Sequence, residues 1–386
     1  MKRFGHAVAA ADPRPLLIAA VSGRALAASA ARAGRAALVL DLFGDRDTRS
    51  VALESRVVSV PGAPRLDPAR LLAAAEELAP AGRISGLVYG SGFEGQPDLL
   101  EQLARNRPLF GNSPEAVRLV RDPKRLFPLL DGLGIAYPAI SHRPPTDPRG
   151  WLMKDPGGAG GAHIRVAGDP APGGAHYYQR LEIGRNLSAL FLADGRRAQV
   201  IGLNEQWTSP ARANAPFLFG GVVGRVRIAS GVFEGLSAQL DRLVAEAGLV
   251  GLNGVDLLLG DRGWLLLEVN PRPTASMELY DADLPKGLLE AHLEACRGML
   301  PERPPAGGPS RALAVVYAPK RWEVPEECVF PEWCRDLPVG GTRCAPGDPV
   351  CTVHAEDATP AVAMRVAQER AERVRSLIRS AGAAVV

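Results

Sequence analysis

Three side chains with oxygen donors stand out in the second half of the chain. Asp256 lies in the apolar run Val255–Leu259, while Glu268 and Asn270 lie within and just beyond the run Trp264–Val269. A Gly-Asp-Arg-Gly turn joins the runs, so two adjacent strands are expected to bring Asp256 near Glu268, with Asn270 further along the same face. Mg²⁺ takes such ligands together with phosphate oxygens and water, whereas zinc and copper favour softer donors. The spacing therefore predicts a magnesium site.

Arg272 continues the same face of the second strand. A guanidinium at this place can meet a phosphate or an oxyanion. The alternative is an ordinary hairpin with polar residues on its solvent face. An acid and an asparagine within otherwise apolar strands fit that alternative poorly, so we expect Arg272 to act in catalysis.

Lys154 ends the short run Trp151–Lys154 and precedes a glycine-rich loop, residues 155–162. A lysine on a strand can contact phosphate oxygens while the backbone N–H groups of such a loop fold over them. The alternative is a flexible turn in a hairpin that resumes at Ala162–Val166. The chain lacks a G-x-x-x-x-G-K-[ST] pattern, which excludes the P-loop class.

The first 115 residues predict a small doubly wound α/β domain. The run Leu16–Val21, the helical pattern Arg24–Ala33 and the run Ala36–Leu42 form a parallel strand-helix-strand unit. A helix is expected at Pro68–Leu78 and a strand at Gly86–Tyr89. No G-x-G-x-x-G follows the first strand, so a dinucleotide site is unsupported, but a substrate crevice at the carboxyl ends of the strands stays open.

Beyond this domain the pattern becomes α+β. Short strands alternate with glycine turns, and helical periodicity at Phe233–Ala247 stops at Gly248. Pro301–Pro309 is a linker, and a tail of short strands closes with a helix at Pro360–Ser380. The predicted domains are 1–115, 116–300 with a mobile glycine loop at 155–162, and 310–386.

The order of these parts resembles the ATP-grasp superfamily over roughly residues 15–300. The run from Glu268 to Pro273 is its most specific piece, and Lys154 with the glycine loop supports it. The resemblance implies ATP and magnesium as cofactors, with a pair of metal ions that Mn²⁺ can replace. It also implies metal ligation by Asp256, Glu268 and Asn270, and catalysis by Arg272 and Lys154.

The same resemblance implies a set of ATP contacts. Asp122-Pro123-Lys124 is similar to the family's Asp-Lys element, with a proline inserted. The segment Tyr178–Glu182 resembles the hinge that lines the adenine. The ATP-binding residues implied are Lys124, Lys154, Gly157, Gly158, Gly160, Gly161, Gln179, Arg180, Leu181 and Glu182.

A narrower resemblance is to predicted carboligases that include the tyramine–glutamate ligase of methanofuran biosynthesis. It rests on Gly90-Ser91-Gly92-Phe93-Glu94, Gly111-Asn112-Ser113-Pro114 and the run from Asn270 to Glu278. It implies an ADP-forming carboxylate–amine ligase that works through an acyl phosphate. The substrates implied are glutamate and an aromatic amine or amino acid, in the biosynthesis of a one-carbon coenzyme.

Candidate substrate residues are Arg225, Ser276 and Glu278. Arg225 lies in an arginine-rich stretch, where a solvated surface is the ordinary alternative. His163 follows the glycine loop, and we expect a packed or exposed loop residue there rather than a catalytic base, because no neighbouring residue marks a base–orienter pair.

Two other functions stay open. The tail segments Asp336–Pro338 and Gly347–Val353 resemble the small C-terminal domain of biotin carboxylase-like proteins, which suggests an enzyme that makes carboxyphosphate from bicarbonate. The chain has no Met-Lys-Met sequence for biotin attachment, which counts against it. The second is a non-catalytic ATP-binding regulatory protein, which the loss of a metal ligand would favour, and none is lost.

Composition argues against several kinds of partner. The 386 residues carry a net charge of only +3, so no nucleic acid is expected. No run reaches the roughly 18 apolar residues of a membrane span, and the N-terminus lacks a signal-peptide core, so we expect a cytoplasmic protein. The five cysteines form no C-x2-C pair, which favours reduced thiols over zinc. The expected partners are small carboxylate and amine substrates, and a homodimer is common among such ligases.

Overall fold

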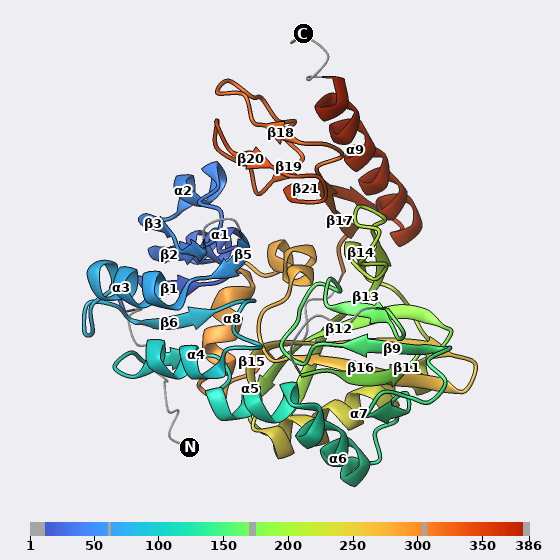
Figure 1. Ribbon diagram of the computed structural model, residues 1–386. Coiled ribbons are helices and arrows are strands. Elements are labelled where there is room, and N and C mark those ends of the chain that lie inside the picture. Colours follow the sequence, from blue (N-terminus) through green and yellow to red (C-terminus); the bar gives the residue numbers. More distant parts are fainter. Residues whose placement is uncertain (1–11, 61–62, 170–174, 303–306, 381–386) are drawn as a thin grey trace, which may run out of the picture.

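The N-terminal part of the chain is a parallel sheet with helices on both faces (Figure 1). The computed structural model describes residues 12–60, 63–169, 175–302 and 307–380. Five strands lie in the order β3-β2-β1-β6-β7, and every pair is parallel. The elements are β1 (Leu16–Ala19), α1 (Arg24–Arg32), β2 (Ala37–Asp41), α2 (Arg46–Val51), β3 (Glu54–Val57), β4 (Ser59–Val60), β5 (Ala63–Leu66), α3 (Pro68–Leu78), β6 (Gly86–Tyr89), α4 (Pro97–Ala104) and β7 (Leu109–Phe110).

Alternation along β1 explains the double cover. Leu16 and Ile18 enter a core shared with α1, whereas Leu17 and Ala19 enter a second core with α3 and α4. Helix α3 begins where the sequence predicts. The Asp67 carboxylate accepts hydrogen bonds from the backbone N–H groups of Ala69 and Arg70, and Pro68 occupies the first helical position. The predicted doubly wound domain is confirmed.

A small antiparallel sheet follows, with strands in the order β10-β9-β11-β8. Two helices lead into it, and the polypeptide then passes through the glycine-rich loop between β9 and β10. Its elements are α5 (Pro114–Arg121), α6 (Pro123–Leu133), β8 (Ile140–Ser141), β9 (Trp151–Lys154), β10 (Ile164–Val166) and β11 (Tyr177–Arg180).

The largest sheet has eight strands in the order β16-β15-β12-β13-β14-β17-β21-β19. Its last three strands belong to the tail, so the predicted C-terminal domain continues the central sheet through the pairing of β14 with β17. The elements are β12 (Arg185–Asp194), β13 (Ala198–Thr208), β14 (Phe219–Gly224), α7 (Ser230–Ala247), β15 (Val250–Gly260), β16 (Gly263–Asn270), η1 (Ala275–Leu279), η2 (Asp281–Asp283), α8 (Gly287–Ala295), β17 (Ser310–Tyr317), β18 (Trp322–Glu323), β19 (Cys334–Arg335), β20 (Arg343–Cys344), β21 (Pro349–Asp357) and α9 (Pro360–Ser380).

Several central elements are longer than the sequence predicts. The apolar run Ser188–Leu192 lies inside the ten-residue β12, because β15 pairs with all of that strand and β13 pairs with it from Leu187 to Ala193. Helix α7 begins at Ser230, before the first apolar residue of its pattern, and ends at Gly248, whose φ of 62° is left-handed. The apolar pattern of the sequence predicted the centres of these elements, whereas backbone hydrogen bonding determines where they end.

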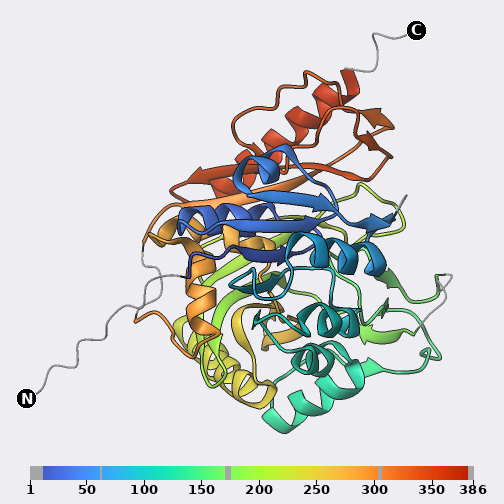
Figure 2. The ribbon, with the colours of Figure 1, turned by 90° about the vertical axis from the view of Figure 1, so that its left-hand side faces the viewer.

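Helix α8 joins the N-terminal domain to the central sheet, and it contacts α1 on one side and β12 and β15 on the other (Figure 2). It carries a fully buried histidine, His292. The Nδ1 atom accepts from the Leu252 N–H at 2.8 Å, and Nε2 lies 3.1 Å from the Phe110 carbonyl oxygen. Burial lowers the pKa of His292 to about 4, so a neutral ring links the two domains.

A second link holds the loop after β16. Asn112, between β7 and α5, donates from Nδ2 to the Pro271 carbonyl oxygen at 2.9 Å and to Asn253 Oδ1 at 2.7 Å. Its Oδ1 accepts from the Val250 N–H at 2.8 Å, and the Tyr89 hydroxyl also donates to Pro271 at 2.8 Å. The buried side chain of Asn112 therefore orients the backbone that carries Arg272.

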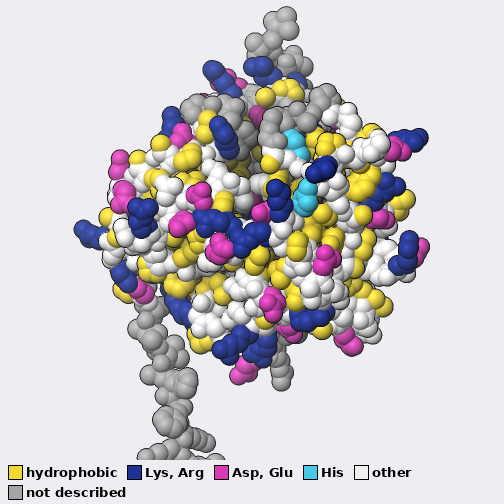
Figure 3. Space-filling view, turned by 60° about the horizontal axis from the view of Figure 1, so that its bottom comes forward, with side chains coloured by type: hydrophobic (Ala, Val, Ile, Leu, Met, Phe, Trp, Pro, Cys, Tyr) yellow, Lys and Arg dark blue, Asp and Glu magenta, His cyan; other side chains and the backbone are white. Residues whose placement is uncertain are grey.

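No helix within the described residues is long and apolar enough to cross a bilayer. On the face shown in Figure 3, basic and acidic side chains are interspersed among hydrophobic ones.

Replacing Asn112 by Ala is expected to lower the free energy of unfolding by roughly 2–4 kcal/mol, because three buried hydrogen bonds lose their partner. Urea denaturation followed by circular dichroism measures the loss. The exposed Asn106→Ala variant is the matched control and should stay within about 0.5 kcal/mol of the wild type. Equal stability of the two variants would show that the Asn112 link is dispensable.

Candidate active site

The predicted oxygen ligands meet on the β15–β16 hairpin. Asp256 pairs directly with Glu268 across the two strands, and the register shifts by one residue immediately afterwards. Asn270 Nδ2 donates to Asp256 Oδ2 at 3.0 Å, and Gln206 on β13 donates to Asp256 Oδ1 at 2.9 Å. The strand spacing thus brings Asp256, Glu268 and Asn270 together as expected, with a β-bulge beside them.

The carboxylates of Asp256 and Glu268 are both largely buried, and the pKa of each is shifted. Burial, followed by the charge of Glu268, raises the pKa of Asp256 to about 6. Burial alone would raise the pKa of Glu268 as well, but Arg121, His163 and Lys154 lower it to about 2. No ion pair joins Asp256 to another described residue, and its two oxygens accept from Gln206 and Asn270 instead.

Arg121, the last residue of α5, lies at the centre of the site and was missed by the sequence analysis. Its guanidinium forms an ion pair with Glu268 and donates to the carbonyl oxygens of Pro156 at 3.1 Å and Gly158 at 2.6 Å. It is 8% exposed. Arg121 follows Val117 by four residues, so both lie on the buried face of α5. An arginine on an otherwise apolar helix face is the feature of the sequence that could have identified it.

Lys154 is buried at the end of β9, where the sequence places it. Burial lowers its pKa, and the carboxylates of Glu268 and Asp256 oppose that change. His163 is packed, as expected, with its ring against Gly158. Its Nε2 nevertheless lies 3.9 Å from Glu268 Oε2, and its Nδ1 has no hydrogen-bond partner within the described residues.

The glycine loop is docked against both domains. A Cβ atom on Gly157 would lie 2.5 Å from the Cα of Gly95, so the loop touches the N-terminal domain where neither partner carries a side chain. The Gly160 carbonyl oxygen accepts from the Phe219 N–H at 2.9 Å on the central sheet. In this structure the glycine loop therefore contacts both the N-terminal domain and the central sheet, and its mobility stays a prediction.

The remaining predicted ATP contacts lie at different depths. Gln179 on β11 is buried, and its Nε2 has no hydrogen-bond partner among the described residues. Arg180 stacks on Trp151, and Leu181 and Glu182 are exposed beyond it. Lys124 is exposed in the first turn of α6. The adjoining Pro123 lines a cavity of about 20 Å³ that also contacts Glu268 and Arg121.

Arg272 joins the ligand set to a larger cavity. It forms an ion pair with Glu94 of the N-terminal domain, and its Nη2 donates to Asn270 Oδ1 at 3.3 Å. The same side chain lines a cavity of about 390 Å³ at the carboxyl ends of β1, β2 and β6. A crevice at this edge of the parallel sheet is the substrate site that the sequence analysis kept as a possibility.

The three candidate substrate residues have different places. Glu278 lines the cavity but binds Arg24 with both carboxylate oxygens. Ser276 is buried, and its hydroxyl lies 2.8 Å from that of Thr274. Arg225 does not line the cavity: it pairs with Asp283 at 2.6 Å and donates to the Pro309 carbonyl oxygen. The structure thus assigns Arg225 to packing instead of substrate contact.

Gly161→Ala should release the loop, because φ is +74° and the new Cβ would lie 1.8 Å from the Phe217 carbonyl oxygen. We expect faster hydrogen–deuterium exchange in peptides covering residues 155–165. Gly160→Ala is the control: its φ of +65° adds strain of about 1 kcal/mol, but nothing lies within 4 Å of the new atom. Equal exchange in the two variants would contradict the steric argument.

Asp45 lines the large cavity and has an unusual pKa. Burial, followed by the charges of Asp336, Asp41 and Asp47, raises it to about 8, while Arg24 opposes the change. An acid whose pKa is raised by folding weakens the folded state as pH increases from its unfolded value of about 3.9. The melting temperature of Asp45→Asn should therefore exceed that of the wild type by an amount that grows between about pH 4 and pH 8. Differential scanning fluorimetry against the exposed Asp261→Asn control tests this, and a gap independent of pH would contradict it.

Comparison with known proteins agrees with this geometry. Residues 122–276 match the family described as "ATP-grasp domain", and no curated protein matches the chain. The structure is similar to biotin carboxylase of Campylobacter jejuni in complex with β-γ-ATP, with a TM-score of 0.71 and 13% identity, over 94% of this chain and 95% of that chain. It is also similar to N5-carboxyaminoimidazole ribonucleotide synthetase of Thermotoga maritima, with a TM-score of 0.65 and 17% identity, over 94% and 98%.

A third similar structure is the biotin carboxylase domain dimer of the Hydrogenobacter thermophilus 2-oxoglutarate carboxylase, in complex with MgADP, ADP and bicarbonate. The TM-score is 0.71 and the identity 12%, over 92% of this chain and 89% of that chain. At these identities the likeness concerns the fold. Residues 122–276 therefore form an ATP-grasp domain, in a chain whose fold is similar to that of these carboxylases and this synthetase.

Proposed function

We propose that the protein is an ADP-forming carboxylate–amine ligase that activates its carboxylate substrate as an acyl phosphate. The observation that carries the proposal is the position of Arg272, which touches Asn270 of the ligand set and also lines the cavity of about 390 Å³. A phosphate site and an organic substrate site thus share one guanidinium.

The residues present fit magnesium. Two carboxylates and one amide oxygen are hard donors, and Mg²⁺ is commonly held by one or two carboxylates together with nucleotide phosphates. Asp256, Glu268 and Asn270 would hold it, and bound Mg²⁺ would neutralise phosphate charge.

The nucleotide site follows from the neighbouring elements. Lys154 is buried within the field of Glu268 and Asp256 but forms no direct ion pair with another described residue, so a triphosphate would supply one. The glycine loop offers N–H groups to the phosphates, and Arg121 anchors that loop through the carbonyl oxygens of Pro156 and Gly158. The unpartnered Nε2 of Gln179 is a donor available to the base.

In the proposed reaction the substrate carboxylate attacks the γ-phosphorus of ATP, and ADP leaves with the electrons of the broken P–O bond. The amine then attacks the acyl carbon, loses a proton, and phosphate departs. Arg272 is placed to stabilise the negative charge that develops on the acyl oxygen. Closure of the glycine loop keeps water from the acyl phosphate.

The size and lining of the cavity support an organic substrate larger than bicarbonate. Its volume of about 390 Å³ suits a small organic molecule, and Phe43, Phe219 and Tyr317 contribute aromatic surface. These features support the finer proposal of glutamate joined to an aromatic amine or amino acid, as in the biosynthesis of a one-carbon coenzyme.

Asp256→Asn and Glu268→Gln should each reduce substrate-dependent ADP release by at least about 100-fold, because both weaken the only acidic pair offered to the metal within the described hairpin. Release is measured with Mg-ATP, glutamate and a panel containing tyramine, tyrosine and bicarbonate. Asp256→Asn spares the Glu268–Arg121 pair, so its fold can be checked by its unfolding transition. Glu323→Gln, at an exposed ion pair, is the control.

The substrate dependence decides between functions. Release that requires a carboxylate and an amine supports the ligase. Release with bicarbonate alone would overturn it in favour of carboxyphosphate formation. An Asp256→Asn enzyme with wild-type activity would remove the metal assignment.

A further inference from the structure

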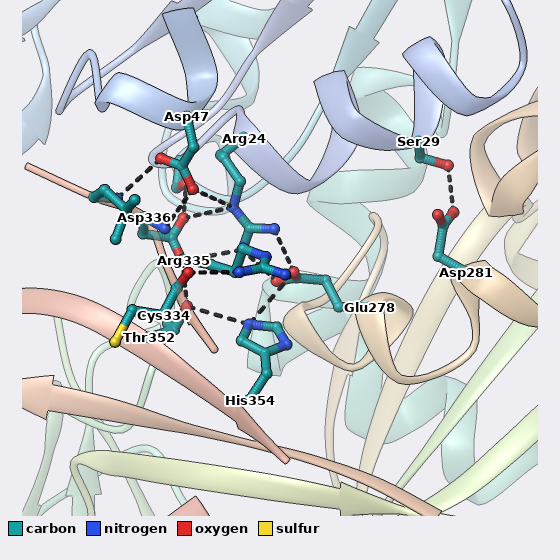
Figure 4. Close-up of polar contacts among 12 residues, drawn as sticks. Arg24, Ser29, Asp47, Glu278, Asp281, Cys334, Arg335, Asp336, Thr352 and His354 are labelled. Atoms are coloured by element: carbon teal, nitrogen blue, oxygen red, sulfur yellow. Dashed lines mark hydrogen bonds and ion pairs between the residues drawn. The ribbon is translucent and has the colours of Figure 1, made fainter. Parts of the chain in front are cut away.

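The large cavity has an acidic end that the proposed reaction does not yet use. Its walls come from the loops after β1, β2 and β6, from the glycine loop, from η1 and from the tail strands β17 and β21. Asp45 and Asp336 line this end, and Arg24 and Glu278 lie beside them. Figure 4 shows how Arg24, Asp47, Asp336 and Glu278 converge from the three parts of the chain.

Arg24 is the cation of this cluster, and its donors are already committed. It binds Glu278 through both carboxylate oxygens, Asp336 at 3.0 Å, and lies 3.8 Å from Asp47 (Figure 4). It is 5% exposed. A single positive charge thus serves three carboxylates, and none of its hydrogen bonds reaches Asp45.

The other nearby aspartates have further donors. Asp41 accepts from the backbone N–H groups of Gly23, Phe43 and Gly44. Asp47 accepts from the N–H groups of Asp336 and Leu337, and Asp336 accepts from the hydroxyls of Ser22 and Thr352. These carboxylates are therefore part of the folded framework.

Asp45 differs from them. It is only 4% exposed and lines the cavity. Its side chain does not cap α2, and no hydrogen bond or ion pair to another described residue satisfies it. A buried carboxylate without a partner is costly. Such a group in the wall of a cavity is a candidate partner for a ligand that carries a positive charge.

We infer that Asp45 binds the amino group of the acceptor substrate as an ammonium, which gives up a proton before its nitrogen attacks the acyl carbon, and that the apolar body of the substrate fills the rest of the cavity. The inference rests on the proposed ligase function, since it concerns the site of the second substrate. The charge of Asp336, at the same end of the cavity, adds to the negative field around Asp45. The apolar part of the lining supports the body of the molecule: Phe43, Leu218, Phe219, Val315, Tyr317 and Val350. The substrate class is thus an amine on a hydrophobic or aromatic skeleton.

Matched probes that differ in charge test the subsite. Tyramine and tyrosol share one skeleton but carry an ammonium and a hydroxyl, and 3-methylbutylamine and 3-methylbutanol form a smaller pair. Calorimetric titration of the full-length protein, with and without a non-hydrolysable ATP analogue, should show at least one amine binding about tenfold or more tightly than its alcohol. Asp45→Asn should abolish that preference while changing the affinity for the alcohol less than about threefold.

The control is Asp261→Asn, in the exposed turn of the β15–β16 hairpin, which should keep the preference. Equal binding of amine and alcohol, no binding of either amine, or a preference that survives Asp45→Asn would overturn the subsite. The proposed function fails separately. An Asp45-dependent preference without ADP release on any substrate pair would leave the subsite and reject the ligase, whereas amine-dependent release insensitive to Asp45→Asn would do the reverse.

Discussion

Ion pairs between buried arginines and carboxylates join parts of the molecule that are distant in sequence, and the catalytic groups depend on them for their positions. Arg121 connects α5 with β16, and Arg272 connects the loop after β16 with Glu94 of the N-terminal domain. Arg24 connects α1 with η1 and the tail. Removal of one partner would leave an uncompensated charge in the interior at a cost of about 3–5 kcal/mol, so these contacts restrict how the lobes can pack.

The buried carboxylates fall into two groups, those with an arginine partner and those without one. Glu268 is compensated by Arg121, whereas the pKa of Asp256 is raised by burial and by Glu268. Asp336 is compensated by Arg24, whereas Asp45 has no such partner. In each pair, one carboxylate has an arginine as its ion-pair partner, and the other forms no ion pair with a described residue. The proposed metal and ammonium positions are the places where binding would relieve this charge.

The glycine loop shows how the framework can also serve movement. Arg121 holds it through two backbone carbonyl oxygens, and Phe219 holds it through a third. Hydrogen bonds of this kind contribute about 1 kcal/mol each, whereas loss of one partner of the buried Arg121–Glu268 pair would cost about 3–5 kcal/mol. The contacts that hold the loop are thus individually weak, as the proposed opening for a nucleotide requires.

Local features of this protein were determined by the sequence itself. The convergence of Asp256, Glu268 and Asn270 follows from a hairpin of two short strands, and the parallel N-terminal domain follows from its strand-helix-strand pattern. Tertiary structure alone decided the rest. Arg121 meets Glu268 across 147 residues, and Arg24 meets Glu278 across 254, distances over which periodicity carries no information. Only the packing of three sheets forms the cavity and leaves the buried carboxylate of Asp45 in its wall without an ion pair to another described residue, because burial and charge compensation are properties of the assembled fold.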